Sequence, residues 1–249
     1  MKYKIYIPID STAVSLGAND VFDAIVSEAK ERKIDIHIVR NGSRGLFWLE
    51  PLIEVETTKG RLAFGPVNLD NDKELFDDEF YLGSDSSKLC LGLTDELSWL
   101  KNQERLTFAR VGITDPVDID DYEEHHGFNG LKNALKQDAQ SIVKTMTDSG
   151  LRGRGGAAFP TGIKWQTVLD TPSDTKYIVC NADEGDSGTY SDRMIMENDP
   201  YVLIEGMIIA GLAVGADYGY IYLRSEYPDA QKTLNKAIQT AKEKGYLGK

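Results

Sequence analysis

A glycine-rich segment with a local excess of positive charge is the strongest chemical feature of this sequence. It reads GLRGRGGAAFPTG from Gly150 to Gly162, and Arg152, Arg154 and Lys164 add cations to it. Glycine lets backbone amides approach a ligand closely and adopts positive φ, which is the geometry of an anion-binding nest. Since the whole chain carries a formal net charge of -12, this local cluster of cations predicts a phosphate-binding loop.

Two familiar phosphate-binding motifs do not describe this segment. A P-loop ends in Gly-Lys-Ser or Gly-Lys-Thr, whereas Gly162 is followed by Ile163, Lys164 and Trp165. The dinucleotide-binding pattern is nominally met from Gly153 to Ala158, but it should follow a buried strand. The residues from Ser141 to Asp148 have a helical pattern instead, so we reject the ordinary Rossmann interpretation.

A second polar segment follows a short apolar strand that we expect from Tyr177 to Cys180. It reads NADEGDSG from Asn181 to Gly188. Ligands of open α/β sheets bind beyond the carboxyl ends of the strands. Carboxylates repel phosphate, so these acids are expected to accept hydrogen bonds from ribitol or ribose hydroxyls, or from an amide or flavin ring N–H. The two loops together fit a ligand with a phosphate at one end and hydroxyls or a ring at the other.

Simpler interpretations stay open for both loops. The arginines of the first loop could serve solubility alone, although Phe159, Pro160 and Trp165 are unusual in a freely solvated segment. The acidic loop could be a capped, solvated turn or a site for a hard cation, since such cations prefer carboxylate oxygens. Its spacing does not match an EF-hand loop, and we predict no metal site in this sequence.

The elements around these loops alternate between strand and helix. Helical patterns run from Leu131 to Lys136 and from Ala139 to Thr147. A helix is expected from Pro200 to Val214, because Asp199-Pro200 supplies a cap and a proline at the first helical position. A strand is expected from Tyr218 to Leu223, and an amphipathic helix from Pro228 to Lys244. This order predicts an α/β layer over residues 106–249.

The first part of the chain predicts a separate domain. A strand from Lys2 to Ile7, a helix from Ala18 to Lys33 and a strand from Asp35 to Val39 come first. A hairpin from Leu52 to Phe64 and a short helix from Glu74 to Tyr81 follow. This β-α-β-β-α order is that of a thioredoxin-like unit, an inference from fold analogy. A short strand is also expected from Leu106 to Val111, and we place the domain boundary near residue 105.

Composition narrows the class of protein further. The chain has 249 residues and a net charge of -12, so nucleic acid and anionic membrane surfaces are poor partners. Its two cysteines, Cys90 and Cys180, define no disulfide framework and favour a reducing compartment. The N-terminus lacks a signal-peptide pattern, and the stretch from Tyr201 to Val214 is too short to span a bilayer. We therefore expect a cytoplasmic protein.

The two motifs resemble the flavin- and NADH-binding core of a known family. The segments from Gly150 to Trp165 and from Cys180 to Gly185 look like those of the complex I flavoprotein subunit, NAD-linked hydrogenases and NAD-dependent formate dehydrogenases. The resemblance covers about residues 110 to 249. The segment from Arg40 to Pro51 is most similar to the beta subunit of the formate dehydrogenases. The implied architecture is α/β, a thioredoxin-like domain (1–105) followed by an FMN- and NADH-binding α/β domain (106–249).

The resemblance also implies site residues. By it, Gly153, Arg154, Gly155 and Lys164 hold the FMN phosphate and ring, with Gly156 and Ala157 beside them. Asn181, Asp183, Glu184 and Gly185 line the flavin, Phe159 stacks on the nicotinamide or adenine, and Asp186 contacts the dinucleotide. The flavin carries the hydride chemistry, so no catalytic side chain of the general-base kind is expected. Electrons would leave for iron–sulfur clusters in partner subunits of a multi-subunit oxidoreductase, without direct membrane insertion.

The sequence departs from the family pattern at three points. Ala158 stands where many relatives have glycine, which is tolerable if its φ is negative, and Asp186 stands where many have glutamate. Family members continue with a Gly-Glu-Glu motif and the four cysteines of a [4Fe–4S] cluster, so we expect an N-terminal portion of a longer subunit. The first domain also lacks cluster cysteines. A non-enzymatic scaffold or interaction module is the alternative function.

Overall fold

The first domain is built on a mixed β-sheet. In the computed structural model, which describes residues 3–154 and 156–248, this sheet has five strands in the order β2-β1-β3-β4-β5. The elements of the domain are β1 (Tyr3–Tyr6), α1 (Ser11–Ser15), α2 (Ala18–Arg32), β2 (Ile36–Val39), η1 (Phe47–Leu49), β3 (Ile53–Thr57), β4 (Gly60–Phe64), α3 (Asp72–Asp77), η2 (Phe80–Leu82), β5 (Cys90–Leu93), η3 (Thr94–Glu96) and α4 (Ser98–Lys101).

The strand pairing of this domain is that of a thioredoxin-like fold. β1 and β2 pair in parallel and are connected by the helix α2. β3 lies antiparallel to both β1 and β4. A βαβ unit joined to a hairpin and a helix produces this order. The sequence prediction of a thioredoxin-like first domain is therefore confirmed. The parallel pair forms because α2 presents an apolar stripe of Val21, Ile25 and Ala29 to the sheet.

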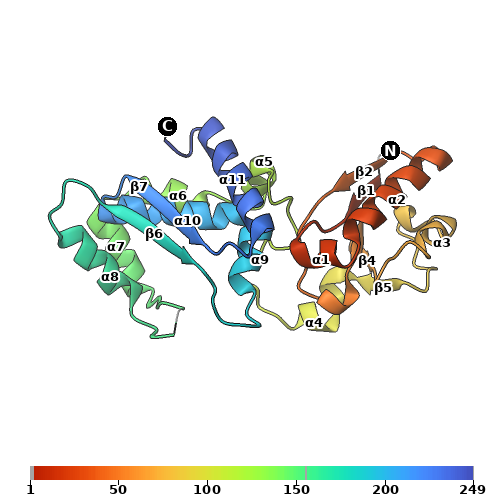
Figure 1. Cartoon of the computed structure of the whole chain (residues 1–249), viewed down its shortest axis with the longest axis horizontal. Helices are drawn as coiled ribbons and strands as arrows, with labels where there is room; N and C mark the ends of the chain where they lie inside the picture. The colour runs from red at the N-terminus through yellow and green to blue at the C-terminus, as the bar shows by residue number, and fades with distance from the viewer. Residues whose placement is uncertain (1–2, 155, 249) are drawn as a thin grey trace.

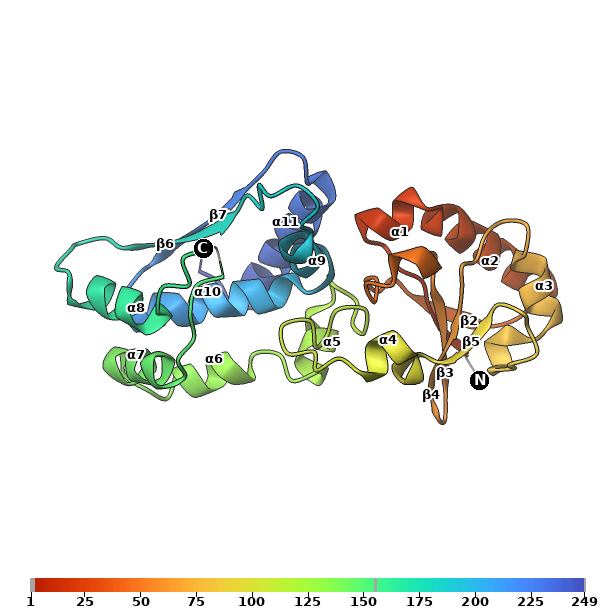
Figure 2. The same ribbon diagram turned by 90° about the horizontal axis from the view of Figure 1, so that it is seen from below.

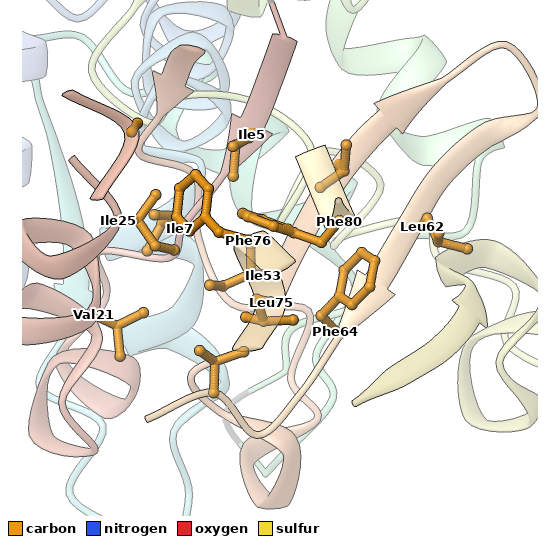
Figure 3. Close-up of a cluster of buried hydrophobic side chains, with 13 residues drawn as sticks. Ile5, Ile7, Val21, Ile25, Ile53, Leu62, Phe64, Leu75, Phe76 and Phe80 are labelled. Atoms are coloured by element: carbon orange, nitrogen blue, oxygen red, sulfur yellow. The ribbon is translucent and has the colours of Figure 1, made fainter. Parts of the chain in front are cut away.

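The core of the first domain lies between the sheet and the helices α2 and α3. Figure 3 shows Ile5 and Ile53 from the strands facing Ile25 of α2 and Phe76 of α3. Phe80 packs edge-on against both Phe64 and Phe76, with ring centroids 5.7 and 5.1 Å apart. These side chains are buried, so apolar burial holds the domain together.

One expected strand is wrong. Residues Leu106 to Val111 form bends and turns, and Leu106 is 88% exposed. The alternation of apolar residues misleads here because the segment pairs with no strand among the described residues. The fifth strand of the sheet is instead β5, which pairs with β4 across a bulge at Ala63/Phe64.

The second domain combines helices with a short parallel sheet. Its elements are α5 (Ile119–Glu124), α6 (Asn129–Ala134), α7 (Ala139–Asp148), α8 (Thr161–Asp170), β6 (Tyr177–Ala182), α9 (Ser191–Asn198), α10 (Pro200–Val214), β7 (Tyr218–Leu223) and α11 (Pro228–Glu243). β6 and β7 pair in parallel from Tyr177↔Tyr218 to Ala182↔Leu223. The crossover between them carries α9 and α10, so the expected α/β layer is confirmed.

The helix α10 is the centre of the second domain. It begins at Pro200 and ends before Gly215, whose φ of 72° closes the helix in the left-handed region. Its residues enter three apolar clusters, with Ile204 packed towards α5 and α6, Ala213 towards α7, and Leu203 towards α9 and α11. Because α10 packs against helices on several sides and leaves only Gly206 and Leu212 exposed, it fixes the positions of its neighbours.

The β6–β7 sheet covers α10 with one face and exposes the other. Ile178 and Ile221 point into the apolar clusters. The opposite face presents Val179, 64% exposed, between tyrosines that are 52–67% exposed, namely Tyr177, Tyr218, Tyr220 and Tyr222. Parallel sheets normally bury both faces, so this aromatic ladder leaves one face of the strand pair open.

The two domains lie beside one another along the long axis of the molecule (Figures 1 and 2). The views place α9 on the side of the second domain that faces α1. Across this seam the side-chain amide of Asn41 donates to the carbonyl of Gly112 at 2.8 Å. Within the second domain, Arg110 donates to the Asp199 carboxylate at 2.9 Å. The boundary near residue 105 stays a prediction. No helix of residues 3–154 and 156–248 is long and apolar enough to cross a membrane.

Candidate functional site

The glycine-rich loop is closed at its base by short-range hydrogen bonds. Arg152 and Pro160 form an isolated antiparallel bridge, and the amide of Gly153 donates to the carbonyl of Phe159 at 2.9 Å. The Arg152 Nε donates to the carbonyl of Ala158 at 2.6 Å. The segment 151–160 between α7 and α8 is therefore a narrow closed loop, the lasso. Arg152 contributes to the shape of the lasso instead of facing a ligand.

The tip of the lasso exposes the groups that could bind an anion. Arg154, Gly156 and Ala157 are exposed, while Gly155 lies outside the described residues. Gly156 has a φ of 97°, and a Cβ built there would meet no other atom within 4 Å. The backbone at Gly156 is consequently open to close approach by a ligand, as an anion-binding nest requires.

The helix α8 begins directly after the lasso. Its N-cap residue is Pro160, which makes no side-chain cap hydrogen bond, and its first turn contains no acid. The Nζ atom of Lys164 lies 5.9 Å from the ring centre of Phe159, whose side chain is 47% exposed. Positive charge and an uncapped helix start favour an anion here, and the Phe159 ring is available for stacking.

A close helix contact fixes the base of the lasso. A Cβ on Gly162 would lie 2.3 Å from Oγ1 and 2.7 Å from Cα of Thr147. Only glycine permits α8 to approach α7 this closely. Trp165 and Leu169 of α8 pack with Ile178 of β6, so the lasso is held in register with the strand that leads to the acidic loop.

Ala158 does not have the negative φ at which alanine could replace glycine in this loop without strain. Its φ is 49°, in the left-handed region where a Cβ clashes with the backbone carbonyl. The condition of negative φ, under which alanine replaces glycine here without strain, is therefore not met. The lasso needs the left-handed turn to bring Phe159 back to Gly153, and alanine adopts it at a cost of about 1–2 kcal/mol.

The acidic loop leaves the carboxyl end of β6, as the sequence predicts. Asn181 lies in the last part of the strand, and its side-chain oxygen accepts the amide of Asp183 at 3.1 Å. The side chain of Asn181 is exposed and that of Asp183 is half-buried, while Gly185 and Asp186 are exposed. These groups can offer oxygen acceptors to hydroxyls or to a ring N–H.

Glu184 occupies a different position from its neighbours. Its carboxylate accepts the amides of Asp192 and Arg193 at 2.6 and 3.0 Å and the Ser191 hydroxyl at 3.2 Å. It therefore caps the N-terminus of α9. The Tyr227 hydroxyl also donates to it at 3.1 Å. Burial, and secondarily the Glu184 charge, raises the pKa of Asp192 above its ordinary value.

Sequence reasoning missed two residues that hold the acidic loop in place. Arg224 follows β7 and donates to the carbonyl of Glu184 at 2.8 Å, and Tyr227 binds the carboxylate. Because β6 and β7 are parallel, Arg224 and the acidic loop emerge at the same edge of the sheet. The rule that points to the acidic loop could therefore have pointed to Arg224 as well.

The predicted site residues form two groups in space. One group lies on the lasso and the start of α8, and the other at the carboxyl end of β6. Figure 1 shows both loops along the lower edge of the second domain. The hydrogen bonds and ion pairs of the described residues join members within each group and not between the groups. Among the same residues, no set of three or more His, Cys, Asp or Glu side chains could hold a metal ion.

This geometry defines a class of domain. It is an α/β domain with a cationic lasso and an acidic loop beyond a parallel strand. The family model of the Nuo51 FMN-binding domain matches residues 146–247, which contain both loops. These residues are therefore similar to Nuo51 FMN-binding domains. The resemblance to flavoprotein subunits, and the FMN-type domain that it implies, are confirmed.

The chain is also similar to curated proteins over its second domain. It is 49% identical over 148 residues to the HndC subunit of the NADP-reducing hydrogenase of Solidesulfovibrio fructosivorans, covering 59% of this chain and 30% of that protein. It is 48% identical over 131 residues to an NADH-quinone oxidoreductase subunit of Aquifex aeolicus, covering 53% of this chain and 30% of that one. The matched part is thus about a third or less of these relatives.

A solved structure resembles the whole chain more loosely. The crystal structure of an NAD+-reducing [NiFe]-hydrogenase in the air-oxidized state covers 98% of this chain and 41% of its own, with 22% identity and a TM-score of 0.45.

Proposed function

We propose that this chain provides the FMN-binding part of a flavoprotein subunit that exchanges electrons between NAD(H), FMN and iron–sulfur clusters. The observation that carries the proposal is the exposed lasso with Arg154 and Lys164, on the same edge of the domain as the acidic loop that follows β6. The similarity of residues 146–247 to FMN-binding domains gives the ligand its identity, because both loops fall inside the matched range.

The residues present fit such a ligand. The open backbone at Gly156, the uncapped start of α8 and the Lys164 ammonium suit a phosphate. Gly153 and Ala157 belong to the same lasso, while the proposed contact of Gly155 falls on a residue outside the described ones. On the other side, Asn181, Asp183 and the backbone of Gly185 would accept hydrogen bonds from ribityl hydroxyls or from the ring. Phe159 and Asp186 would meet the dinucleotide.

The protein contributes binding and orientation, and the cofactor contributes the redox chemistry. FMN, when bound, accepts a hydride from NADH and gives up electrons singly, a chemistry that amino-acid side chains do not supply. Glu184 would act mainly through its backbone, since its carboxylate is engaged by α9. The half-exposed Phe159 ring would orient the second nucleotide.

The more specific context rests on sequence resemblance. We propose a cytoplasmic multi-subunit enzyme, with the beta subunit of an NAD-dependent formate dehydrogenase as the first candidate because of the segment from Arg40 to Pro51. The names of the relatives, a hydrogenase subunit and a quinone oxidoreductase subunit, support the equivalent subunit of those complexes. Iron–sulfur and catalytic subunits would be the partners.

An absorbance titration tests the proposal. Purified protein is mixed with FMN, freed of excess flavin, and then given NADH without oxygen. Retained flavin bands that bleach with NADH support an electron-transfer subunit. Absence of retained flavin at micromolar protein would contradict the proposal and favour the alternative, a scaffold or interaction module that keeps the fold without the cofactor.

A pair of matched variants separates the acidic loop from general charge effects. Asp183→Asn removes a carboxylate at the proposed ring or ribityl side and should raise the dissociation constants of FMN and riboflavin by about the same factor, roughly tenfold. Asp229→Asn, on the exposed start of α11, should change neither constant. Equal effects of the two variants would show that Asp183 does not touch the flavin.

A further inference from the structure

The helix α9 is held at two places by parts of the protein that are distant in sequence. At its N-terminus the Glu184 carboxylate accepts the amides of Asp192 and Arg193 at 2.6 and 3.0 Å. Glu184 itself has a φ of 45°, and Arg224 holds its carbonyl at 2.8 Å. Any shift of the first turn of α9 must therefore move the acidic loop with it.

The body of α9 is held by the first domain. The Nη2 of Arg193 donates to the Thr12 hydroxyl at 2.8 Å. The amide and the hydroxyl of Ser11 both donate to Glu197 Oε2 at 2.9 Å. These contacts tie two turns of α9 to the start of α1, and Figures 1 and 2 show the two helices facing each other at the seam.

The seam is also closely packed at the end of α9. Asn198 is fully buried, and a Cβ on Gly42 of the first domain would lie 2.3 Å from its Cγ. Glycine at this position lets the first domain seat directly on α9. The seam thus fixes α9 by hydrogen bonds at Arg193 and Glu197 and by shape at Asn198.

We infer that the first domain positions the acidic loop through α9, with Arg193 and Glu197 as positioning residues for Glu184. The path is short and continuous: Ser11 and Thr12 hold the helix, and the end of the helix holds the loop. The inference rests on the proposed function for its consequence, because the loop is placed in the flavin site. It gives the cysteine-poor first domain a role that needs no cluster of its own.

The expected effect is a displacement of the loop and not its loss. Met196 of α9 packs in an apolar cluster with Ala230 and Leu234 of α11, so the helix stays in the second domain when the seam is weakened. A loosened seam leaves Glu184 attached to a less well-placed helix. The affinity for FMN should then fall by a factor of about three to ten, the effect of one or two hydrogen bonds.

Variants of the first domain alone test this path in the full chain. Thr12→Val keeps the shape of the side chain and removes the acceptor for Arg193, and Thr12→Ser restores the acceptor. Gly42→Ala forces a Cβ against Asn198. Ser15→Ala, on the same helix but bonded only to the carbonyl of Thr12, is the matched control. None of these residues belongs to the proposed flavin site.

Two measurements follow each variant: hydrogen exchange at the amides of Asp192 and Arg193 without cofactor, and the FMN dissociation constant. Thr12→Val and Gly42→Ala should speed exchange at these two amides about tenfold, relative to amides of α11, and raise the FMN constant three- to tenfold. Thr12→Ser and Ser15→Ala should stay within twofold of the parent. If Gly42→Ala does not fold, Thr12→Val with its serine rescue carries the test.

The inference is overturned if Thr12→Val leaves both the exchange at Asp192 and Arg193 and the FMN constant unchanged. A general loss of stability would instead speed exchange in α11 equally, which also contradicts a specific path. A parent protein that binds no FMN refutes the proposed function, and the exchange rates alone then decide whether α9 links the first domain to the loop.

Discussion

The carboxylate of Glu205 is the polar centre of the second domain, and its removal should be costly. It lies on α10, is 8% exposed, and accepts the Tyr122 hydroxyl at 2.6 Å and the amides of Phe128 and Leu131, each at 2.8 Å. It thereby joins α10 to α5 and caps the start of α6. Burial and the bond to Glu205 raise the pKa of Tyr122, so the phenol stays a donor.

The substitution Glu205→Gln keeps the size of the side chain and replaces one acceptor oxygen with a donor. At least one of the three hydrogen bonds to a charged acceptor is lost, about 1.5–3 kcal/mol, and one buried donor is left unsatisfied. We expect the free energy of unfolding to fall by about 2–4 kcal/mol. Glu243→Gln, on the exposed end of α11, should change it by less than about 0.5 kcal/mol.

Urea unfolding followed by circular dichroism measures these differences, and hydrogen exchange at the amides of Phe128 and Leu131 locates them. Tyr122→Phe removes a single donor and should cost about 1–2 kcal/mol. Because both side chains share one network, the double variant should cost less than the sum. A Glu205→Gln protein as stable as the parent, or strictly additive costs, would refute this account of the domain.

Three further predictions concern the lasso and the buried carboxyl group of Glu50. Ala158→Gly should raise the free energy of unfolding and Ala158→Val should lower it, by on the order of 1 kcal/mol each, because the φ of Ala158 is 49°. Equal stability of the two variants in urea would argue against the left-handed turn. Gly162→Ala should lower the free energy of unfolding by about 1–3 kcal/mol through the clash with Thr147. Thr147→Ala should rescue this loss only in part, since the contact to the Cα atom of residue 147 persists. Full rescue in the same assay would show that the helices do not approach this closely. Burial raises the pKa of Glu50 from 4.5 to about 8, so its contribution to stability is present below pH 4.5 and is lost as pH rises towards 8. Glu50→Gln should therefore flatten the fall of stability over this window, by up to about 1.4 kcal/mol per pH unit, in denaturation curves taken at successive pH values; an unchanged slope would mean that Glu50 is ionised throughout.

The elements with a regular apolar period could be predicted from the sequence. The helices α2 and α11 and the strand β7 begin and end within a residue or two of the expected positions, and α10 begins at the Pro200 that marks its start in the sequence. Each is packed on an apolar core, and the period of 3.6 or 2 residues reports that packing directly. The two candidate loops were predictable for a related reason, because glycines and acids stand where these regular elements stop.

The helix α9 shows why other features could not be predicted. Its buried residues include Glu197, which accepts hydrogen bonds from Ser11, and Asn198, which packs on Gly42, so no apolar stripe marks it. Its cap is Glu184, seven positions before Ser191 and outside any local capping pattern. The roles of Arg193 and Gly42 likewise depend on contacts between segments far apart in sequence, which periodicity does not report.

The central claim is that the cationic lasso binds the phosphate of a flavin nucleotide. The most direct test compares the dissociation constants of FMN and riboflavin for the parent protein and for the Arg154→Ala/Lys164→Ala variant, with Lys232→Ala on α11 as the control. The parent and the control should prefer FMN by about tenfold or more, and the double variant should lose most of this preference, keeping only the part that the backbone at Gly156 and the start of α8 provide. A double variant that keeps the full preference for FMN would contradict the claim.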